Sequence, residues 1–126
     1  MNVVRATEEH VTEAIGWAER RGIFGIPRDT FSSVGFVVEG LAGVWLYLTG
    51  STIAYGEMLI SNPDATKELR REAMAMVVAT LLECARSAGC RTVLAPCLRE
   101  DVGTFLLANG FVCLGTNLYA ANLGKD

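Results

Sequence analysis

The sequence predicts a mixed α/β domain in which helices flank a central sheet. Residues 53–60 are apolar on both faces, as is typical of a central strand. A long apolar helix pattern follows and ends at Gly89, and a second apolar strand and a short helix come after it. The complete expected order is strand, helix, loop, three strands, helix, strand, helix and strand material, which is typical of an α/β fold.

Size and composition indicate one folded domain over residues 1–126. The chain is 51% hydrophobic and 20% charged, which is enough apolar material for a core. No apolar run reaches the roughly 18 residues that span a bilayer, and the first residues lack the order of a signal peptide. We therefore expect a cytoplasmic protein with no membrane partner.

Charge and metal-ligating residues exclude two further classes of function. The net charge is −3, and the only dense basic pairs are Arg20-Arg21 and Arg70-Arg71, so no nucleic-acid partner is expected. The four cysteines have no C-x-x-C spacing, and the chain has a single His, so we expect no metal. Buried, reduced thiols are the plainer interpretation, although Cys97 ends an expected strand and could line a cleft.

The N-terminal part begins with a short strand over residues 3–6. Thr7 is expected to cap a helix with Glu8 and Glu9 in its first turn, and Gly22 ends that helix. His10 falls in the first turn, where a solvated helix residue is a simpler interpretation than a catalytic one. Residues 22–33 are irregular but apolar, with room for one helical turn.

Three strands are expected over residues 36–39, 44–48 and 53–60. In the second, Trp45 and Tyr47 share one face, which could either support a homodimer or pack under a helix. In the third, Gly56 suggests a bulge. Glu57 follows it on an otherwise apolar face, so its carboxylate must be paired, solvated in a cleft or protonated.

The second half begins with a helix over residues 63–88, which Asn62 caps, interrupted before Ala73. Its core stripe consists of Leu69, Ala73, Met76, Val77, Thr80, Leu81, Cys84 and Ala88. A strand over 92–95 and a helix over 100–108 follow, closed by a glycine cap at Gly110. Residues 112–114 and 118–123 supply the last strand material.

The segment Arg70-Arg71-Glu72-Ala73-Met74-Ala75 and the later pair Gly110-Phe111 carry a resemblance to the GNAT N-acyltransferases. The resemblance extends over nearly the whole chain. The chain looks similar to small phage and bacterial members of this family. It implies a GNAT-like fold with a mixed, mostly antiparallel central sheet. It also implies that acetyl-CoA lies where the central strand and the strand after the main helix separate.

The same resemblance implies cofactor-binding residues. The family's phosphate signature, Gln/Arg-x-x-Gly-x-Gly/Ala, falls on Arg70, Arg71, Ala73 and Ala75, with Ala73 where the first glycine is usual. Backbone amides at a helix start bind phosphate, but amides inside a helix are already used, so an ordinary helix is the alternative. The family's second signature is Asn, later Ala and Tyr, and finally Gly-Phe. Gly110-Phe111 matches its end, and Arg99 stands in its Asn position.

The catalytic expectations follow from the resemblance and from the chemistry of acyl transfer. Glu57 lies on the strand where many GNAT enzymes place their base, and a salt bridge or a rim position is the alternative. The amides of Leu59 or Ile60 could contact the acetyl carbonyl. Leu106 stands in the position of the usual acid Tyr, so Tyr119 or a water would have to replace that acid.

Three hypotheses remain open from the sequence. The first is an N-acyltransferase that uses acetyl-CoA and an unknown amine acceptor. The second is an inactive GNAT-fold protein that serves as a binding or virion-associated module. The third is an unrelated α/β domain without a ligand.

Overall fold

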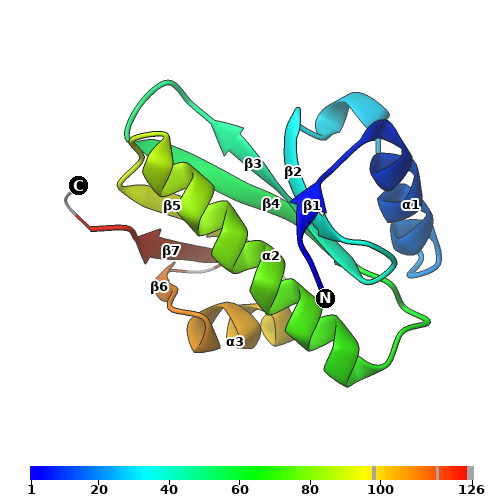
Figure 1. Cartoon of the computed structure of the whole chain (residues 1–126). Coiled ribbons are helices and arrows are strands. Elements are labelled where there is room, and N and C mark those ends of the chain that lie inside the picture. The colour runs from blue at the N-terminus through cyan, green and yellow to red at the C-terminus, as the bar shows by residue number, and fades with distance from the viewer. Residues whose placement is uncertain (98, 116, 125–126) are drawn as a thin grey trace. The chain divides into compact units, whose positions relative to one another are not determined.

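The computed structural model describes residues 1–97, 99–115 and 117–124 (Figure 1). Within them, seven strands form one sheet in the order β1-β2-β3-β4-β5-β7-β6. The β1–β2, β5–β7 and β6–β7 pairs are antiparallel, and the β4–β5 pair is parallel. The mixed, mostly antiparallel sheet and the central place of β4 confirm the predicted fold class.

The elements follow the predicted order. The helices are α1 Glu8–Glu19, the 3-10 helix η1 Arg28–Thr30, α2 Lys67–Ser87 and α3 Glu100–Ala108. The strands are β1 Val4–Arg5, β2 Val34–Val38, β3 Ala42–Leu48, β4 Ile53–Ser61, β5 Thr92–Pro96, β6 Val112–Gly115 and β7 Leu118–Asn122.

The chain divides into two compact units. The first comprises Met1–Trp45 and Met58–Leu81, and the second comprises Leu46–Glu57 and Leu82–Asp126. The boundaries fall inside β3, β4 and α2, so each of these elements contributes to both units. A single domain over residues 1–126 stays a prediction.

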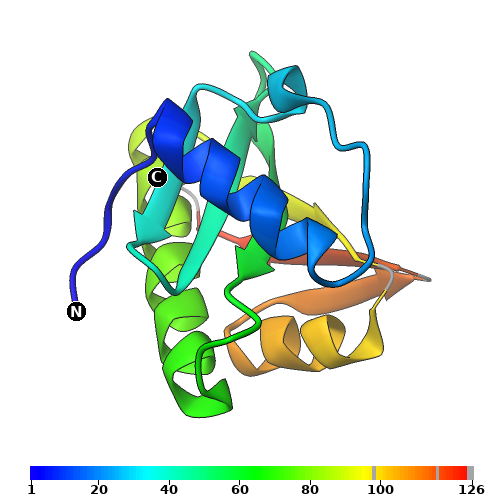
Figure 2. The ribbon, with the colours of Figure 1, turned by 90° about the vertical axis from the view of Figure 1, so that its right-hand side faces the viewer.

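In the first unit, α1 begins at a capping box. Thr7 is its N-cap, and the Thr7 amide donates a 2.9 Å hydrogen bond to Nδ1 of His10. Nε2 of His10 lies 3.0 Å from a carboxylate oxygen of Glu39, which follows β2. His10 therefore fixes the start of α1 beside the β2–β3 turn, and Figure 2 shows α1 lying across β2 and β3.

The indole of Trp45 forms the centre of the first unit's core. Trp45 is 1% exposed, and its ring lies against the backbone of Gly35 and Gly43, where an added Cβ would come within 2.3 Å and 3.0 Å of indole atoms. Phe31 packs edge-on against it at 4.8 Å between centroids. Of the two alternatives for Trp45, packing inside the protein is the one that the structure shows, because the side chain is fully enclosed.

Helix α2 begins later than predicted, at Lys67 instead of Pro63. The Asn62 side chain accepts from the Asp64 amide and donates to the Gly40 carbonyl, both at 2.9 Å, so it stabilises a turn and does not cap the helix. The core stripe is confirmed at Ala73, Val77 and Leu81, which are at most 1% exposed. Leu69, however, is 42% exposed, because it lies in the first turn of the helix.

In the second unit, β7 pairs with β5 along its whole length, over 118–122 and 92–96. Helix α3 has the predicted bounds. Gly110 follows it with φ 93°, and the Phe111 amide donates to the Leu106 carbonyl at 3.0 Å, which is the predicted glycine cap. Among the described helices, none is long and apolar enough to cross a membrane.

Candidate active site

Strands β4 and β5 are paired only over their first residues. Their parallel register joins 53–55 to 92–94. Both strands continue, but in the described chain the pairing between them ends at Tyr55 and Leu94. Within the second unit, the backbone groups of residues 56–57 and of residues 95–96 are therefore not paired with each other. Such groups can hydrogen-bond an extended ligand.

Glu57 lies on β4 directly after this point. Its side chain is exposed, and it has neither an ion pair nor a side-chain hydrogen bond to any residue that the structure describes. The salt-bridge interpretation of Glu57 is therefore not realised. A solvated carboxylate at a ligand-accessible edge is able to accept a proton, directly or through a water.

The backbone of β4 leaves the usual extended conformation at the next residue. Met58 has φ 59°, in the left-handed region that non-glycine residues rarely adopt. A conformation of this kind costs of order 1 kcal/mol and interrupts the alternation of the strand. The sequence suggested a bulge at Gly56, whereas the irregular backbone conformation lies two residues later, at Met58. Leu59 and Ile60, which follow it, are half-buried.

The start of α2 leaves few amides for a phosphate. The hydroxyl of Thr66 accepts from the Leu69 amide at 3.3 Å, and the Thr66 carbonyl accepts from the Arg70 amide at 3.0 Å. The amides from Arg70 to Ala75 are therefore inside the helix and already used. The expected amide cradle over these residues is not formed. In the described part of α2, only the amides of Lys67 and Glu68 precede the first hydrogen-bonded amide, that of Leu69.

The side chains in this segment have different environments. Ala73 is 0% exposed, so it cannot touch a ligand, and Ala75 is half-buried. Arg70 donates to the carbonyls of Pro63 and Ala65, at 3.3 and 3.0 Å. Arg71 is exposed and has no side-chain partner among the described residues. Of the predicted phosphate ligands on α2, Arg71 is thus the one whose guanidinium is available.

Two more arginines hold the loop between β4 and α2. Arg20 binds the Asp64 carboxylate and donates to the Asn62 side chain at 3.3 Å. Arg21 binds the Ser61 carbonyl and donates to the Ser61 hydroxyl at 3.0 Å. Three of the four arginines in the two basic pairs, Arg20, Arg21 and Arg70, therefore bind groups of the protein itself.

Comparison with solved structures identifies the fold. A Mycobacterium tuberculosis protein solved in complex with CoA matches with a TM-score of 0.74 at 16% identity, over 91% of this chain and 74% of that chain. The ribosomal-protein-S18-alanine N-acetyltransferase of Escherichia coli matches with a TM-score of 0.74 at 12% identity, over 99% and 95% of the two chains. This chain has the GNAT N-acyltransferase fold.

A longer protein gives the same result. The N-acetylglutamate synthase of Neisseria gonorrhoeae, solved with coenzyme A and L-arginine, matches with a TM-score of 0.77 at 12% identity. The match covers 98% of this chain but 33% of the synthase, so this chain corresponds to about a third of that protein. No protein-family model and no curated protein matches the sequence.

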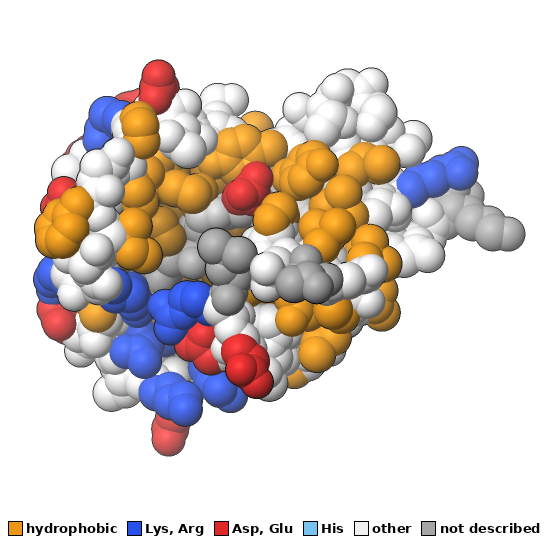
Figure 3. Space-filling model, turned by 180° about the vertical axis from the view of Figure 1, so that it is seen from behind, with side chains coloured by type: hydrophobic (Ala, Val, Ile, Leu, Met, Phe, Trp, Pro, Cys, Tyr) orange, Lys and Arg blue, Asp and Glu red, His pale blue; other side chains and the backbone are white. Residues whose placement is uncertain are grey.

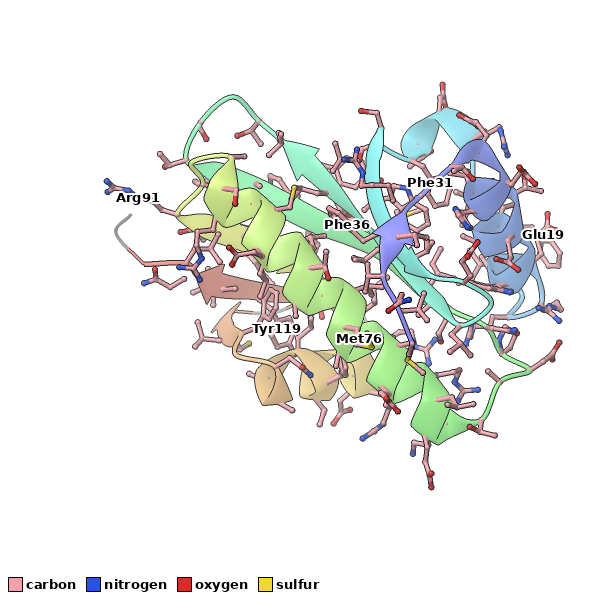
Figure 4. All side chains as sticks on the ribbon, viewed as in Figure 1. Glu19, Phe31, Phe36, Met76, Arg91 and Tyr119 are labelled. Carbon is pink, nitrogen blue, oxygen red and sulfur yellow. The ribbon has the colours of Figure 1, made fainter. Side chains whose placement is uncertain are left out.

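Within the GNAT fold, the expected acid position is apolar. Leu106 on α3 is 4% exposed and can neither donate nor accept a proton. Tyr119 on β7 is half-buried, and its phenol lies against α3, where a Cβ added to Gly103 would be 2.2 Å from the hydroxyl oxygen (Figure 4). Tyr119 therefore brings a hydroxyl to the α3 helix that carries the expected acid position.

The environment of Tyr119 favours its neutral form. Loss of hydration raises the pKa of the phenol above its usual value of 10.0, and electrostatic interactions with Cys113, Cys97 and Glu100 raise it further. The phenol is therefore protonated at neutral pH. All these groups belong to the second unit.

Arg99 occupies the N-cap position of α3. Its guanidinium makes a two-point contact with Asp101, at 3.1 and 2.7 Å, and this hydrogen bond lowers the pKa of the Asp101 carboxyl. The side chain of Arg99 is exposed but already paired. A phosphate contact by Arg99 stays a prediction, and it would require competition with Asp101.

The predicted residues divide between the two units. Glu57, Tyr119 and Arg99 lie in the second unit, and the predicted residues between Leu59 and Ala75 lie in the first. Sequence reasoning missed Met58 and Gly103. No sequence signal marks Met58, and Gly103 could have been noticed only as a glycine inside a helix. In the described part of the chain, no three His, Cys, Asp or Glu side chains are placed to hold a metal.

Proposed function

We propose that this protein is an N-acyltransferase that uses an acyl-CoA donor and an amine acceptor. The observation that carries the proposal is that the pairing of β4 with β5 ends at Tyr55 and Leu94 in a chain with the GNAT fold. Structures of this fold with CoA bound, among them those from M. tuberculosis and N. gonorrhoeae, support a CoA-type cosubstrate. We take acetyl-CoA as the first donor to test.

Glu57 is the proposed general base. The acceptor nitrogen attacks the thioester carbonyl, the C–N bond forms, and the C–S bond to CoA breaks. The amine proton passes to the Glu57 carboxylate, directly or through a water. The amides of Leu59 and Ile60 are proposed to stabilise the carbonyl oxygen as it becomes negative. An exposed, unpaired carboxylate is consistent with this role for Glu57.

Tyr119 is the proposed hydrogen-bond donor to the departing thiolate. An alkyl thiol has a pKa of about 8.5, below that of Tyr119, so complete proton transfer from the phenol to the thiolate would be uphill. The physical expectation is therefore a hydrogen bond that stabilises the thiolate, with solvent supplying the final proton.

The phosphates of CoA are proposed to bind at the start of α2. The amides of Lys67 and Glu68 are available there, and Arg71 supplies an exposed guanidinium. The Glu68 carboxylate lies in the same turn and opposes an anion, so binding is expected to depend strongly on Arg71. This placement replaces the amide cradle over Arg70 to Ala75.

Titration with CoA and acetyl-CoA tests the proposal. A ligand at 100 times its dissociation constant adds about 2.7 kcal/mol to stability, which is several degrees in Tm for a domain of this size. Arg71→Gln should weaken CoA binding. Arg91→Gln is the matched control, because Arg91 is also exposed and lacks a side-chain partner among the described residues. Absence of binding at millimolar CoA would overturn the proposal.

The second candidate is a GNAT-fold binding module without catalysis. The helical conformation of Arg70 to Ala75 and the apolar Leu106 favour it, because both depart from the catalytic pattern. The same titration separates the two candidates. CoA binding with turnover of an amine supports the enzyme, whereas CoA binding without turnover of any amine in a broad panel supports the module.

A further inference from the structure

Arg21 joins the end of α1 to the last residue of β4. Its guanidinium binds the Ser61 carbonyl and donates to the Ser61 hydroxyl at 3.0 Å. Ser61 is 8% exposed, and it is the only polar or charged residue that is buried among the described residues. Figure 3 shows basic side chains gathered where α1 ends and α2 begins, at the lower left of the view, with acidic side chains among them. Arg21 is half-buried, whereas its neighbour Arg20 is exposed, so Arg21 is the one of this pair that reaches a buried group of the sheet.

The residue that Arg21 binds follows a strained point of the backbone. Met58 lies three residues before Ser61 and has φ 59°. A conformation of this kind persists only where the surrounding structure over-determines it. Directly after Ser61, the Asn62 amide donates to the Leu41 carbonyl at 2.8 Å, and the Asn62 side chain binds the same β2–β3 turn at 2.9 Å. The chain after Met58 is therefore anchored both on the end of α1 and on the β2–β3 turn, all within the first unit.

We propose that Arg21 is a positioning residue for the amides of Leu59 and Ile60. This inference rests on the proposed function, in which these two amides stabilise the carbonyl oxygen of the thioester. Both amides lie between Met58 and Ser61. The direction of their N–H groups therefore depends on the backbone conformation at Met58 and on the anchor at Ser61. In this role Arg21 touches no reacting atom and acts through the backbone of β4.

A positioning role and a purely structural role have different kinetic consequences. Amides that stabilise a developing negative charge act in the transition state and not in the ground state. Their displacement lowers kcat and kcat/KM together and leaves the KM for acetyl-CoA unchanged. A contact that only stabilises the fold changes the fraction of folded protein and leaves kcat per folded molecule unchanged. Kinetics at a temperature where every variant is folded therefore separate the two roles.

Arg21→Met keeps an apolar stem and removes the guanidinium. It should lower kcat by about 10–100-fold and change the KM for acetyl-CoA by less than about twofold, because small displacements of catalytic groups are costly. Arg28→Met is the matched control, since Arg28 binds the Glu8 carbonyl at 2.6 Å and the carboxylate of the same residue at 3.1 Å, in the same unit. Arg21→Lys can keep one hydrogen bond to Ser61 and should recover part of the lost kcat. Equal losses of kcat in Arg21→Met and Arg28→Met would overturn the proposal.

Met58→Gly tests the link between Arg21 and the strained residue. Glycine adopts a positive φ without steric cost, so in this variant the conformation depends less on the anchor at Ser61. The loss of kcat caused by Arg21→Met should therefore be at least about fivefold smaller in the Met58→Gly background than in wild type. The same loss in both backgrounds would overturn the proposal, because Arg21 would then not act through the conformation at Met58.

Hydrogen exchange tests the anchor without any activity. The Asn62 amide is the reporter, because it is bonded to the Leu41 carbonyl directly after β4. Arg21→Met should speed its exchange by at least about tenfold through local opening, whereas Arg28→Met should leave it unchanged. Unchanged exchange in Arg21→Met would overturn the proposal. A wild-type protein that transfers no acyl group would instead overturn the proposed function and the catalytic part of this inference, and exchange alone would then decide whether Arg21 holds the end of β4.

Discussion

Gly103 on α3 lies directly against the phenol of Tyr119 on β7. A Cβ built at Gly103 would be 2.2 Å from the Tyr119 hydroxyl oxygen and 2.7 Å from the ring carbon that bears it. Real side chains do not approach so closely, so the glycine is required by the position of the tyrosine. A glycine inside a helix is normally unfavourable, and here the close approach of a strand residue explains it.

Gly103→Ala should therefore destabilise the protein. Overpacking of a tight contact costs about 1–3 kcal/mol, and the better helix propensity of alanine offsets only roughly 0.5–1 kcal/mol of that. Gly16→Ala in α1 is the matched control, because a Cβ at Gly16 meets nothing within 4 Å. The control should gain stability. Urea unfolding measures both, and equal gains in the two variants would contradict the contact.

Alkaline pH should reduce the contribution of Tyr119 to stability. Its pKa in the folded protein is above the unfolded value of 10.0, so the folded state binds the phenolic proton more tightly. This contribution is complete below pH 10 and is lost as the pH rises through the folded pKa. Tyr119→Phe should lose less stability over that interval than wild type. Denaturant melts at pH 8 and above pH 10, with tyrosinate absorbance as the titration readout, test the difference. Parallel losses in the two proteins would exclude Tyr119.

The sequence predicted the fold well because most of its signals are local. The bounds of α3 follow from acidic residues in its first turn and from Gly110 at its end, and the structure reproduces them. The start of α2 was wrong because two residues compete for the role of cap. Thr66 caps the helix, whereas Asn62 is held by the Gly40 carbonyl, a tertiary contact that no local pattern reveals.

The candidate site was less predictable for the same reason. Met58 has a positive φ although methionine does not favour this conformation. The residue type at this position therefore could not predict the backbone conformation. The contact between Gly103 and Tyr119 joins residues from two elements, and the availability of Arg71 depends on what Arg70 binds. Glu57 could be proposed from the sequence because a carboxylate on an apolar strand is unusual whatever surrounds it.

Glu57→Gln should lower turnover by about 10²–10⁴-fold, because the amide cannot accept the amine proton. Binding of acetyl-CoA, measured by calorimetry, should be unchanged. Glu13→Gln is the matched control, an exposed carboxylate on α1 without an ion pair in the described chain. The assay is release of free thiol from acetyl-CoA with an amine that the panel has identified. Equal activity of Glu57→Gln and wild type would remove Glu57 from the mechanism.

Ala73→Gly tests whether the segment after Arg70 ever binds a phosphate through its backbone. Ala73 is buried and inside α2, so glycine should cost roughly 1 kcal/mol of stability through poorer helix propensity, plus a loss of packing. Ala79→Gly, an exposed position in the same helix, should show the propensity cost alone. CoA affinity should be the same in both variants as in wild type. Tighter CoA binding by Ala73→Gly alone would mean that this segment unwinds around the phosphates when the ligand binds. The helical start of α2 would then be a property of the free protein only.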